Sequence, residues 1–158
     1  MLLFTPPSGC DLGSNGIAMP SPSRPPGARS TVLLVDDDEI LRQMLARTLD
    51  YAGFRVLQAG DGDQALAVVR RLTSRLGLVV TDINMPVMNG FELARAIQPL
   101  YPSLPILFIT GGLPQSSNGV SLREVGEHLL LKPFGPDVFV EAVSNMVALG
   151  PRARRAPA

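Results

Sequence analysis

Short aliphatic runs recur along the chain and alternate with longer stretches in which apolar residues return at helical spacing. This alternation is typical of βαβ units, in which helices connect parallel strands. Most of the runs consist almost entirely of Leu, Ile and Val, as expected of strands that helices cover on both faces. The predicted strands lie at residues 32–35, 55–58, 78–81, 106–109 and 129–131.

The spacing of apolar residues also predicts helices between and after these strands. The predicted helices span about 39–52, about 63–75, 90–98 and a final segment that begins at Pro136, a favoured first-turn residue. Gly53 supplies a left-handed end for the first helix, and Asn89 with Glu92 forms a capping box at the start of the third. The apolar positions are Ile40, Met44, Leu45 and Leu49 in the first helix, Ala65, Leu66, Val69 and Leu72 in the second, and Phe139, Val140, Val143 and Val147 in the last.

The segment between the fourth and fifth strands departs from this pattern. Residues 111–119 are mostly turn-forming, so we expect a loop there, followed by at most a short helix at about 120–125. The pattern as a whole predicts an α/β domain built on a five-stranded parallel sheet.

Length and composition predict a single domain that is soluble in water. The 158 residues suit one core, and the longest uninterrupted apolar run, 65–69, is far too short to span a membrane. A single cysteine, Cys10, excludes an internal disulfide framework and a multi-thiolate zinc site. The apolar start 1–4 lacks the basic region and the length of a signal peptide, so we expect a cytoplasmic protein, with Met19 or a later residue as an alternative start.

The formal net charge of zero hides an uneven distribution. Residues 31–149 carry nine basic and thirteen acidic side chains, and the compensating positive charge lies in the tails. Non-specific affinity for nucleic acid comes mainly from clustered Lys and Arg, so we expect no direct nucleic-acid ligand. Residues 1–30, half of them Pro, Gly and Ser, are expected to form a disordered arm, followed by a domain at 31–149 and a short basic tail at 150–158.

Polar residues stand where the predicted strands end. Carboxyl ends of parallel strands share one edge of a sheet, and ligands bind there. We therefore expect five side chains that are distant in sequence to become neighbours. They are Asp36, Asp37, Asp82, Thr110 and Lys132.

Three carboxylates gathered at one edge repel one another. Each like-charged pair at about 4 Å costs on the order of 4 kcal/mol at an effective dielectric constant near 20. Lys132 offers one compensating charge, and a hard divalent cation such as Mg²⁺ offers two and prefers oxygen ligands. Such a site suits phosphoryl transfer to a carboxylate, with the hydroxyl of Thr110 available to a phosphoryl oxygen.

Four motifs in this order and spacing resemble the receiver domain of two-component response regulators. They are Val-Leu-Leu-Val-Asp-Asp-Asp at 32–38, Thr-Asp-Ile-Asn-Met-Pro at 81–86 with Asn-Gly at 89–90, Ile-Thr at 109–110, and Lys-Pro-Phe at 132–134. The resemblance covers residues 31–149. It implies a flavodoxin-like, doubly wound sheet with strand order 2-1-3-4-5 and helices on both faces.

The resemblance also implies roles for single residues. Asp82 would accept a phosphoryl group from the histidine of a sensor kinase or phosphotransfer protein. Mg²⁺ would be held by Asp37, by Asp36 through water, by Asp82 and by the backbone carbonyl of Asn84. Lys132 would contact the phosphoryl group and Thr110 would turn toward it. Family members often carry an aromatic residue three positions before the lysine, where this chain has Leu129.

Each of these residues also has an ordinary structural interpretation. Asp36–Asp38 could cap the first helix, a role that we assign to Asp38, while Asp82, Thr110 and Lys132 could be turn or surface residues. His128, the only histidine, begins the fifth strand away from the expected site, and we give it no catalytic role.

Three functions follow from this combination of residues. The first is a receiver that signals by protein contact and is not an enzyme in its own right. The second is the receiver portion of a hybrid kinase or phosphorelay, and the third, less favoured, is a Mg²⁺-dependent phosphohydrolase. The sequence leaves open whether the chain forms a homodimer, and it names neither the kinase nor the downstream partner.

Overall fold

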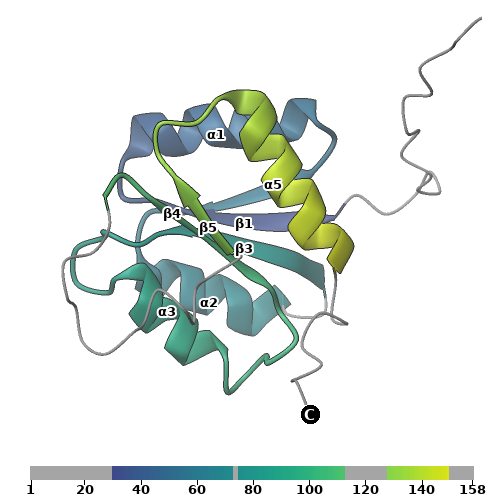
Figure 1. Ribbon diagram of the computed structural model, residues 1–158. Helices are drawn as coiled ribbons and strands as arrows, with labels where there is room; N and C mark the ends of the chain where they lie inside the picture. The colour runs from purple at the N-terminus through teal and green to yellow at the C-terminus, as the bar shows by residue number, and fades with distance from the viewer. Residues whose placement is uncertain (1–29, 73–74, 113–127, 150–158) are drawn as a thin grey trace, which may run out of the picture.

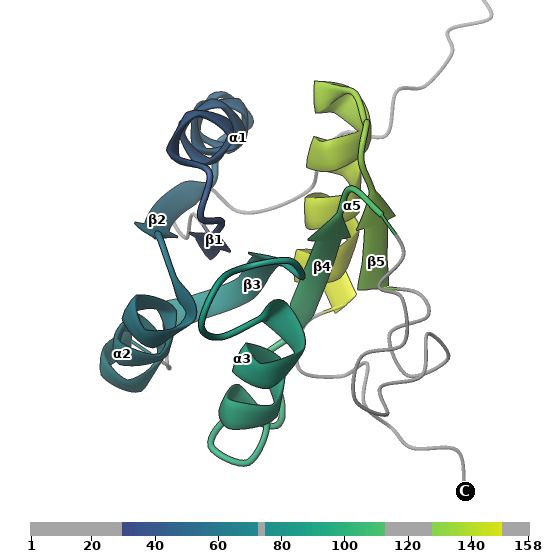
Figure 2. The same ribbon diagram turned by 90° about the vertical axis from the view of Figure 1, so that its left-hand side faces the viewer.

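The computed structural model describes residues 30–72, 75–112 and 128–149. Within these ranges a parallel sheet has the strand order β2-β1-β3-β4-β5, which confirms the predicted topology (Figure 2). The strands are β1 Thr31–Val35, β2 Arg55–Ala59, β3 Leu76–Asp82, β4 Ile106–Thr110 and β5 Leu129–Leu131.

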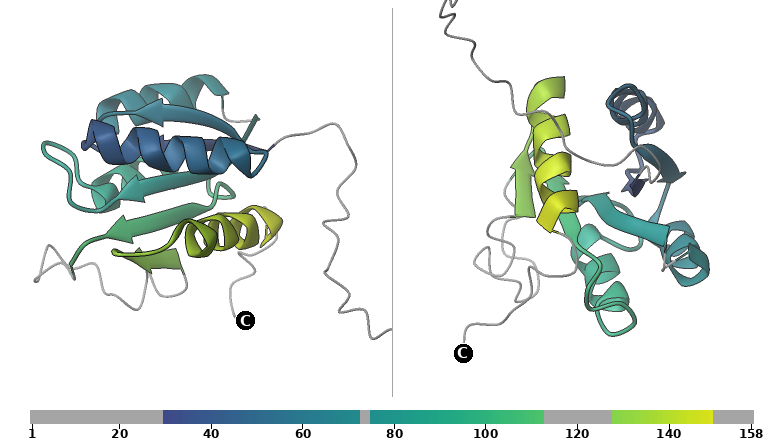
Figure 3. Two further views of the ribbon diagram at one scale, coloured as in Figure 1. Left: turned by 90° about the horizontal axis from the view of Figure 1, so that it is seen from above. Right: turned by 90° about the vertical axis from the view of Figure 1, so that its right-hand side faces the viewer.

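Helices cover both faces of this sheet. The described helices are α1 Glu39–Tyr51, α2 Gly62–Leu72, α3 Gly90–Ile97 and α5 Pro136–Leu149. In Figure 1, α1 and α5 lie on one face of the sheet and α2 and α3 on the other. The left view of Figure 3 shows α1 (blue) and α5 (yellow-green) on the same side of the sheet, in front of the strands. The result is a three-layer α/β architecture, as predicted.

The central strands alternate between two apolar cores. In β3, Leu78 and Val80 pack toward α1 and α5, whereas Val79 packs toward α2 and α3. Because successive side chains of a strand point to opposite faces, a strand covered on both sides must be apolar at every position. The solid aliphatic runs of the sequence therefore reflect burial on two faces.

The predicted starts of α1 and α3 are confirmed, and each helix ends one residue before its predicted end. Asp38 caps α1, where its carboxylate accepts hydrogen bonds from the backbone N–H groups of Ile40 (3.0 Å) and Leu41 (3.1 Å). Asn89 and Glu92 form the capping box of α3. Gly53 follows α1 with a φ of +92°, a conformation that favours glycine.

Two details of the predicted helices are wrong. Ile40 and Met44 were expected on the apolar face of α1, but they are 84% and 56% exposed. The buried face is centred on Leu45 and Leu49, and Ile40 and Met44 lie beside it because each residue turns a helix by about 100°. The second helix ends at Leu72 and does not reach Arg75, because β3 already begins at Leu76, paired with Thr31.

Several expectations fall outside the described residues and stay predictions. They concern the arm before Ser30, the short helix at 120–125, most of the loop at 111–119 and the basic tail at 150–158. Among the helices of the described ranges, none combines the length and the apolar character that crossing a membrane requires.

Candidate phosphoacceptor and metal site

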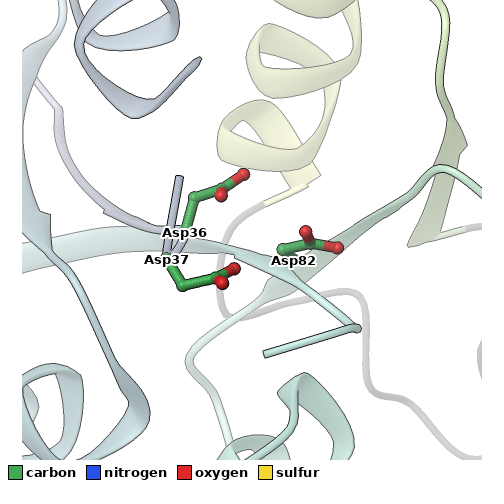
Figure 4. Close-up of side chains that lie close together, drawn as sticks. All are labelled: Asp36, Asp37 and Asp82. Atoms are coloured by element: carbon green, nitrogen blue, oxygen red, sulfur yellow. The ribbon is translucent and has the colours of Figure 1, made fainter. Parts of the chain in front are cut away.

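Three carboxylates converge at the carboxyl edge of the sheet. Asp36 and Asp37 directly follow β1, and Asp82 is the last residue of the neighbouring strand β3. Each offers an oxygen within 4.8 Å of the others (Figure 4). Asp36 and Asp82 are only 1% and 8% exposed, whereas Asp37 is exposed. The predicted gathering of these side chains at one edge is therefore present in the structure.

Lys132 reaches this cluster from the end of β5. Its Nζ lies 3.2 Å from Oδ2 of Asp82 and 3.4 Å from Oδ2 of Asp36. The lysine side chain is 22% exposed, so water screens these ion pairs only in part. One ammonium group faces three carboxylates, which leaves the cluster with a net negative charge.

Asp36 is fixed through its main chain as well as its side chain. The backbone N–H of Asp38 donates to Oδ1 of Asp36 (2.9 Å), and the Asp36 N–H donates to the Ala59 carbonyl at the end of β2 (3.3 Å). Arg42, on α1, donates from its guanidinium to the Asp36 carbonyl (2.5 Å). The sequence interpretation overlooked Arg42, because this contact depends on how a long side chain folds back from the first turn of α1.

Burial dominates the electrostatics of Asp36. Removal from water raises the pKa of this carboxyl above its ordinary value of 3.8, and the negative charge of Asp82 acts in the same direction. The Asp38 N–H and the Lys132 ammonium lower the pKa and offset only part of this effect. The ionised form of Asp36 is thus less stable in the folded protein than in water, so an additional cation would be favourable here.

Asn84 connects Asp82 to Thr110. Its backbone N–H donates to Oδ1 of Asp82 (3.2 Å), and its side-chain Nδ2 donates to the Thr110 hydroxyl (3.2 Å). The Thr110 hydroxyl in turn donates to the Gly112 carbonyl (2.5 Å). The sequence interpretation assigned Asn84 only a backbone role, and the contact of its side chain with Thr110 was missed because it joins the loop after β3 to the end of β4.

Two other residues behave as expected. Asp38 caps α1 and does not belong to the carboxylate cluster. His128 directly precedes β5, at the opposite end of that strand from Lys132, and is therefore remote from the cluster.

The donor set fits a hard divalent cation. Carboxylate oxygens from two adjacent strand ends face one another, and one of them has a raised pKa because it is buried. Oxygen ligands of this kind favour Mg²⁺ or Ca²⁺ over softer metals. These residues could thus supply several ligands to the cation. Because Asp37 is exposed, water and substrate could reach the cation from its side of the cluster.

Comparison with known proteins identifies the family. Residues 32–144 match the family model of the response regulator receiver domain. The chain belongs to this family. The receiver protein CpdR of Brucella abortus is 35% identical over 73% of this chain and 95% of its own length. The chemotaxis protein CheY4 of Vibrio cholerae has a structure that matches 75% of this chain and 99% of its own with a TM-score of 0.64 and 34% identity.

Other relatives are much longer than this chain. The regulatory protein TcrX of Mycobacterium tuberculosis is 34% identical, and the matched region covers 70% of this chain but 47% of TcrX. The transport regulator DctD of Pseudomonas aeruginosa is 37% identical over 78% of this chain but 26% of its own length. The chain thus spans about half of the first relative and about a quarter of the second.

Proposed function

We propose that this receiver accepts a phosphoryl group on Asp82 from a phosphohistidine of a sensor kinase or phosphotransfer protein, and that it signals by contact with another protein. The observation that carries the proposal is the convergence of Asp82 with two further carboxylates and Lys132 at one edge of the sheet. Family membership and the convergence point to the same chemistry, although each rests on different evidence.

Asp82 is suited to act as the nucleophile because its two oxygens have different surroundings. Oδ1 accepts the Asn84 N–H, and Oδ2 lies beside the Lys132 ammonium. In the proposed step a carboxylate oxygen forms a bond to phosphorus while the bond from phosphorus to the donor imidazole nitrogen breaks. The imidazole keeps the electron pair of that bond. Lys132 is positioned to balance the negative charge of the incoming phosphoryl oxygens.

Mg²⁺ is the proposed cofactor. Asp37, Asp82 and the backbone carbonyl of Asn84 would hold it directly, and Asp36 would hold it through water. When bound, the ion would supply positive charge to phosphoryl oxygens. The net negative charge of the cluster supports this assignment.

Thr110 offers a route from the site to the neighbouring loop. A hydroxyl has a single proton, and that of Thr110 is donated to the Gly112 carbonyl. To donate to a phosphoryl group on Asp82, the hydroxyl must leave Gly112. Phosphorylation would therefore weaken the contact that holds the start of the loop after β4, and this change would be the first step in signalling by population shift.

The test is incubation with Mg²⁺ and acetyl phosphate, followed by intact mass measurement. We expect one phosphoryl group per chain, lost in Asp82→Asn and retained in Asp50→Asn, which removes an exposed carboxylate of α1 away from the site. Phosphate release over many turnovers would instead favour the phosphohydrolase. If the wild-type chain shows neither modification nor phosphate release at any Mg²⁺ concentration, both functions are contradicted.

The longer relatives support a second arrangement, in which the receiver is one part of a larger protein. The sensor kinase/phosphatase LuxN of Vibrio harveyi is 38% identical to this chain over 9% of its own length, so a region similar to this receiver occurs within a sensor kinase. We propose a stand-alone receiver first and the receiver portion of a hybrid kinase or phosphorelay second. A cytoplasmic location and the absence of a nucleic-acid ligand stay predictions.

A further inference from the structure

The loop between β3 and α3 contains a residue with an unusual backbone. Val87 has a φ of +69°, and it is the only non-glycine residue of the described ranges with a positive φ. The Met88 N–H donates to the Pro86 carbonyl (2.8 Å). This hydrogen bond joins the two neighbours of Val87 and makes Val87 the central residue of a three-residue turn. A three-residue turn with a central φ near +75° is the rare, strained form of the γ-turn. For a β-branched residue this conformation is a genuine outlier.

Packing of the Val87 side chain does not compensate for this strain. The side chain is 95% exposed, so it gains almost nothing from burial. The conformation must therefore be imposed by the residues on either side. A strained residue persists only when the surrounding structure determines its conformation.

Both ends of the loop are anchored in the molecule. Met85 is buried in the core that contacts α2 and α3. Met88 packs against Gly62 so closely that a Cβ at Gly62 would collide with the Met88 side chain. The Gly90 N–H donates to the Ile83 carbonyl (3.0 Å), and Gly90 lies directly against the carbonyl of Asp82, where a Cβ would not fit. The chain has to reverse direction between these anchors, and it does so at Val87.

The anchored loop fixes the residue that links the parts of the site. Asn84 stands at the start of the loop, where its N–H contacts Asp82 and its side chain contacts Thr110. A change in the shape of the loop would move the Asn84 main chain, and with it the carbonyl that we propose as a ligand of the cation. Residues that support a metal ligand in this way commonly affect metal affinity without touching the metal.

We propose that the γ-turn at Val87 is a positioning element: held by the anchors on either side, it keeps the Asn84 main chain in place for cation binding, and the strain of a valine at this position lowers folding stability. This inference rests on the proposed function because it needs a divalent cation at the site. Beyond its role in the proposed function, the strained loop lowers the free energy of unfolding. Such a cost is expected where a binding site is preformed before its ligand arrives.

The test compares Val87→Asn and Val87→Gly with the wild-type chain. Asn tolerates a positive φ, so it should keep the turn, raise the unfolding midpoint of the metal-free protein by about 2 to 6 °C, and leave the Mg²⁺ dissociation constant unchanged. Gly also relieves the strain but frees the backbone, so it should raise the midpoint less and weaken Mg²⁺ binding by about tenfold. Calorimetry gives the midpoint, and titration followed by the amide resonance of Asn84 gives the dissociation constant.

Val138→Asn is the matched control, because Val138 is a half-exposed valine with a helical backbone in the first turn of α5. This variant should not raise the unfolding midpoint, and it should leave the Mg²⁺ dissociation constant unchanged. If the unfolding midpoint of Val87→Asn falls below that of the wild-type chain, the inference that Val87 is strained is wrong. If Val87→Gly binds Mg²⁺ as tightly as the wild-type chain, the positioning role is wrong. Absence of Mg²⁺ binding by the wild-type chain would instead refute the proposed function, so the two failures are distinguishable.

Discussion

The interior of the sheet and its carboxyl edge are built from the same strands under opposite physical rules. In the interior, β1 and β4 bury every side chain, and nearly all of these side chains are aliphatic or aromatic. At the edge, β1, β3 and β4 lead to the carboxylates of Asp36 and Asp82 and the hydroxyl of Thr110, which are buried as well. Burial stabilises the first group and opposes the charge of the second.

This contrast separates residues that fold the chain from residues that do chemistry. Interior residues should act on the free energy of unfolding and leave phosphoryl transfer intact, whereas edge residues should act on transfer and change stability in either direction. A substitution that violates this division would show that the two regions are coupled. The predictions below begin with the largest expected change in stability.

Phe139→Ala should cause the largest loss. Phe139 is fully buried between α5 and the sheet and stacks on Phe134 with ring centroids 5.4 Å apart. Deleting a buried aromatic ring leaves a cavity and typically costs about 3 to 5 kcal/mol of unfolding free energy. Urea unfolding measures the loss, with Asp82→Asn as the edge variant for comparison. A greater loss in Asp82→Asn than in Phe139→Ala would contradict the division between interior and edge.

The interior was largely predictable from the sequence because its rules are local. A strand covered on both faces is solidly apolar, and the capping residues of α1 and α3 act within a single turn. The error at Ile40 and Met44 shows the limit of such patterns. An apolar stripe on a helix has two flanks, and only packing against the sheet decides which flank is buried.

Lys132→Ala should have the second largest effect. Its removal leaves Asp36 and Asp82 without the ammonium group that lies 3.4 and 3.2 Å away. Unpaired buried charges cost about 3 to 5 kcal/mol, but partial exposure of Lys132 reduces the expected loss to about 2 kcal/mol in metal-free protein. Added Mg²⁺ should restore more stability to this variant than to the wild-type chain, as thermal unfolding with and without Mg²⁺ would show. An equal response of the two proteins to Mg²⁺ would argue against a shared site.

Asp37 and Asp38 form a matched pair of neighbouring carboxylates with opposite expected effects. Asp38→Ala removes the N-cap of α1 and should cost about 1 kcal/mol of unfolding free energy while Mg²⁺ affinity stays the same. Asp37→Asn should leave stability within about 0.5 kcal/mol, since this side chain is exposed, and weaken Mg²⁺ binding strongly. Chemical unfolding and Mg²⁺ titration of both variants check the pair. Equal effects of the two variants on Mg²⁺ would mean that the cluster acts only through its overall charge.

The edge was predictable only in part. Because parallel strands end at one edge of a sheet, the sequence alone predicted that Asp36, Asp82 and Lys132 lie close together, as they do. It could not find Arg42, the side-chain role of Asn84 or the turn at Val87. These depend on rotamers and on a loop whose shape is set by anchors in two different helices, which no local pattern in the sequence records.

Asp36→Asn should produce a small gain in stability, and the size of this gain depends on pH. Burial raises the pKa of Asp36 in the folded protein above the 3.8 of the unfolded chain, so the folded state holds this proton more tightly. The carboxyl group therefore favours folding least above its raised pKa, where it is ionised in both states, and its penalty disappears as the pH falls below 3.8. Asparagine carries no charge, so the variant should be slightly more stable than the wild-type chain at neutral pH in the presence of a chelator, by less than the loss in Asp38→Ala. This gain should shrink steadily on acidification. Unfolding experiments at neutral and acidic pH measure it, and a gain that grew as the pH fell would mean that the ion pair with Lys132 outweighs burial at this edge.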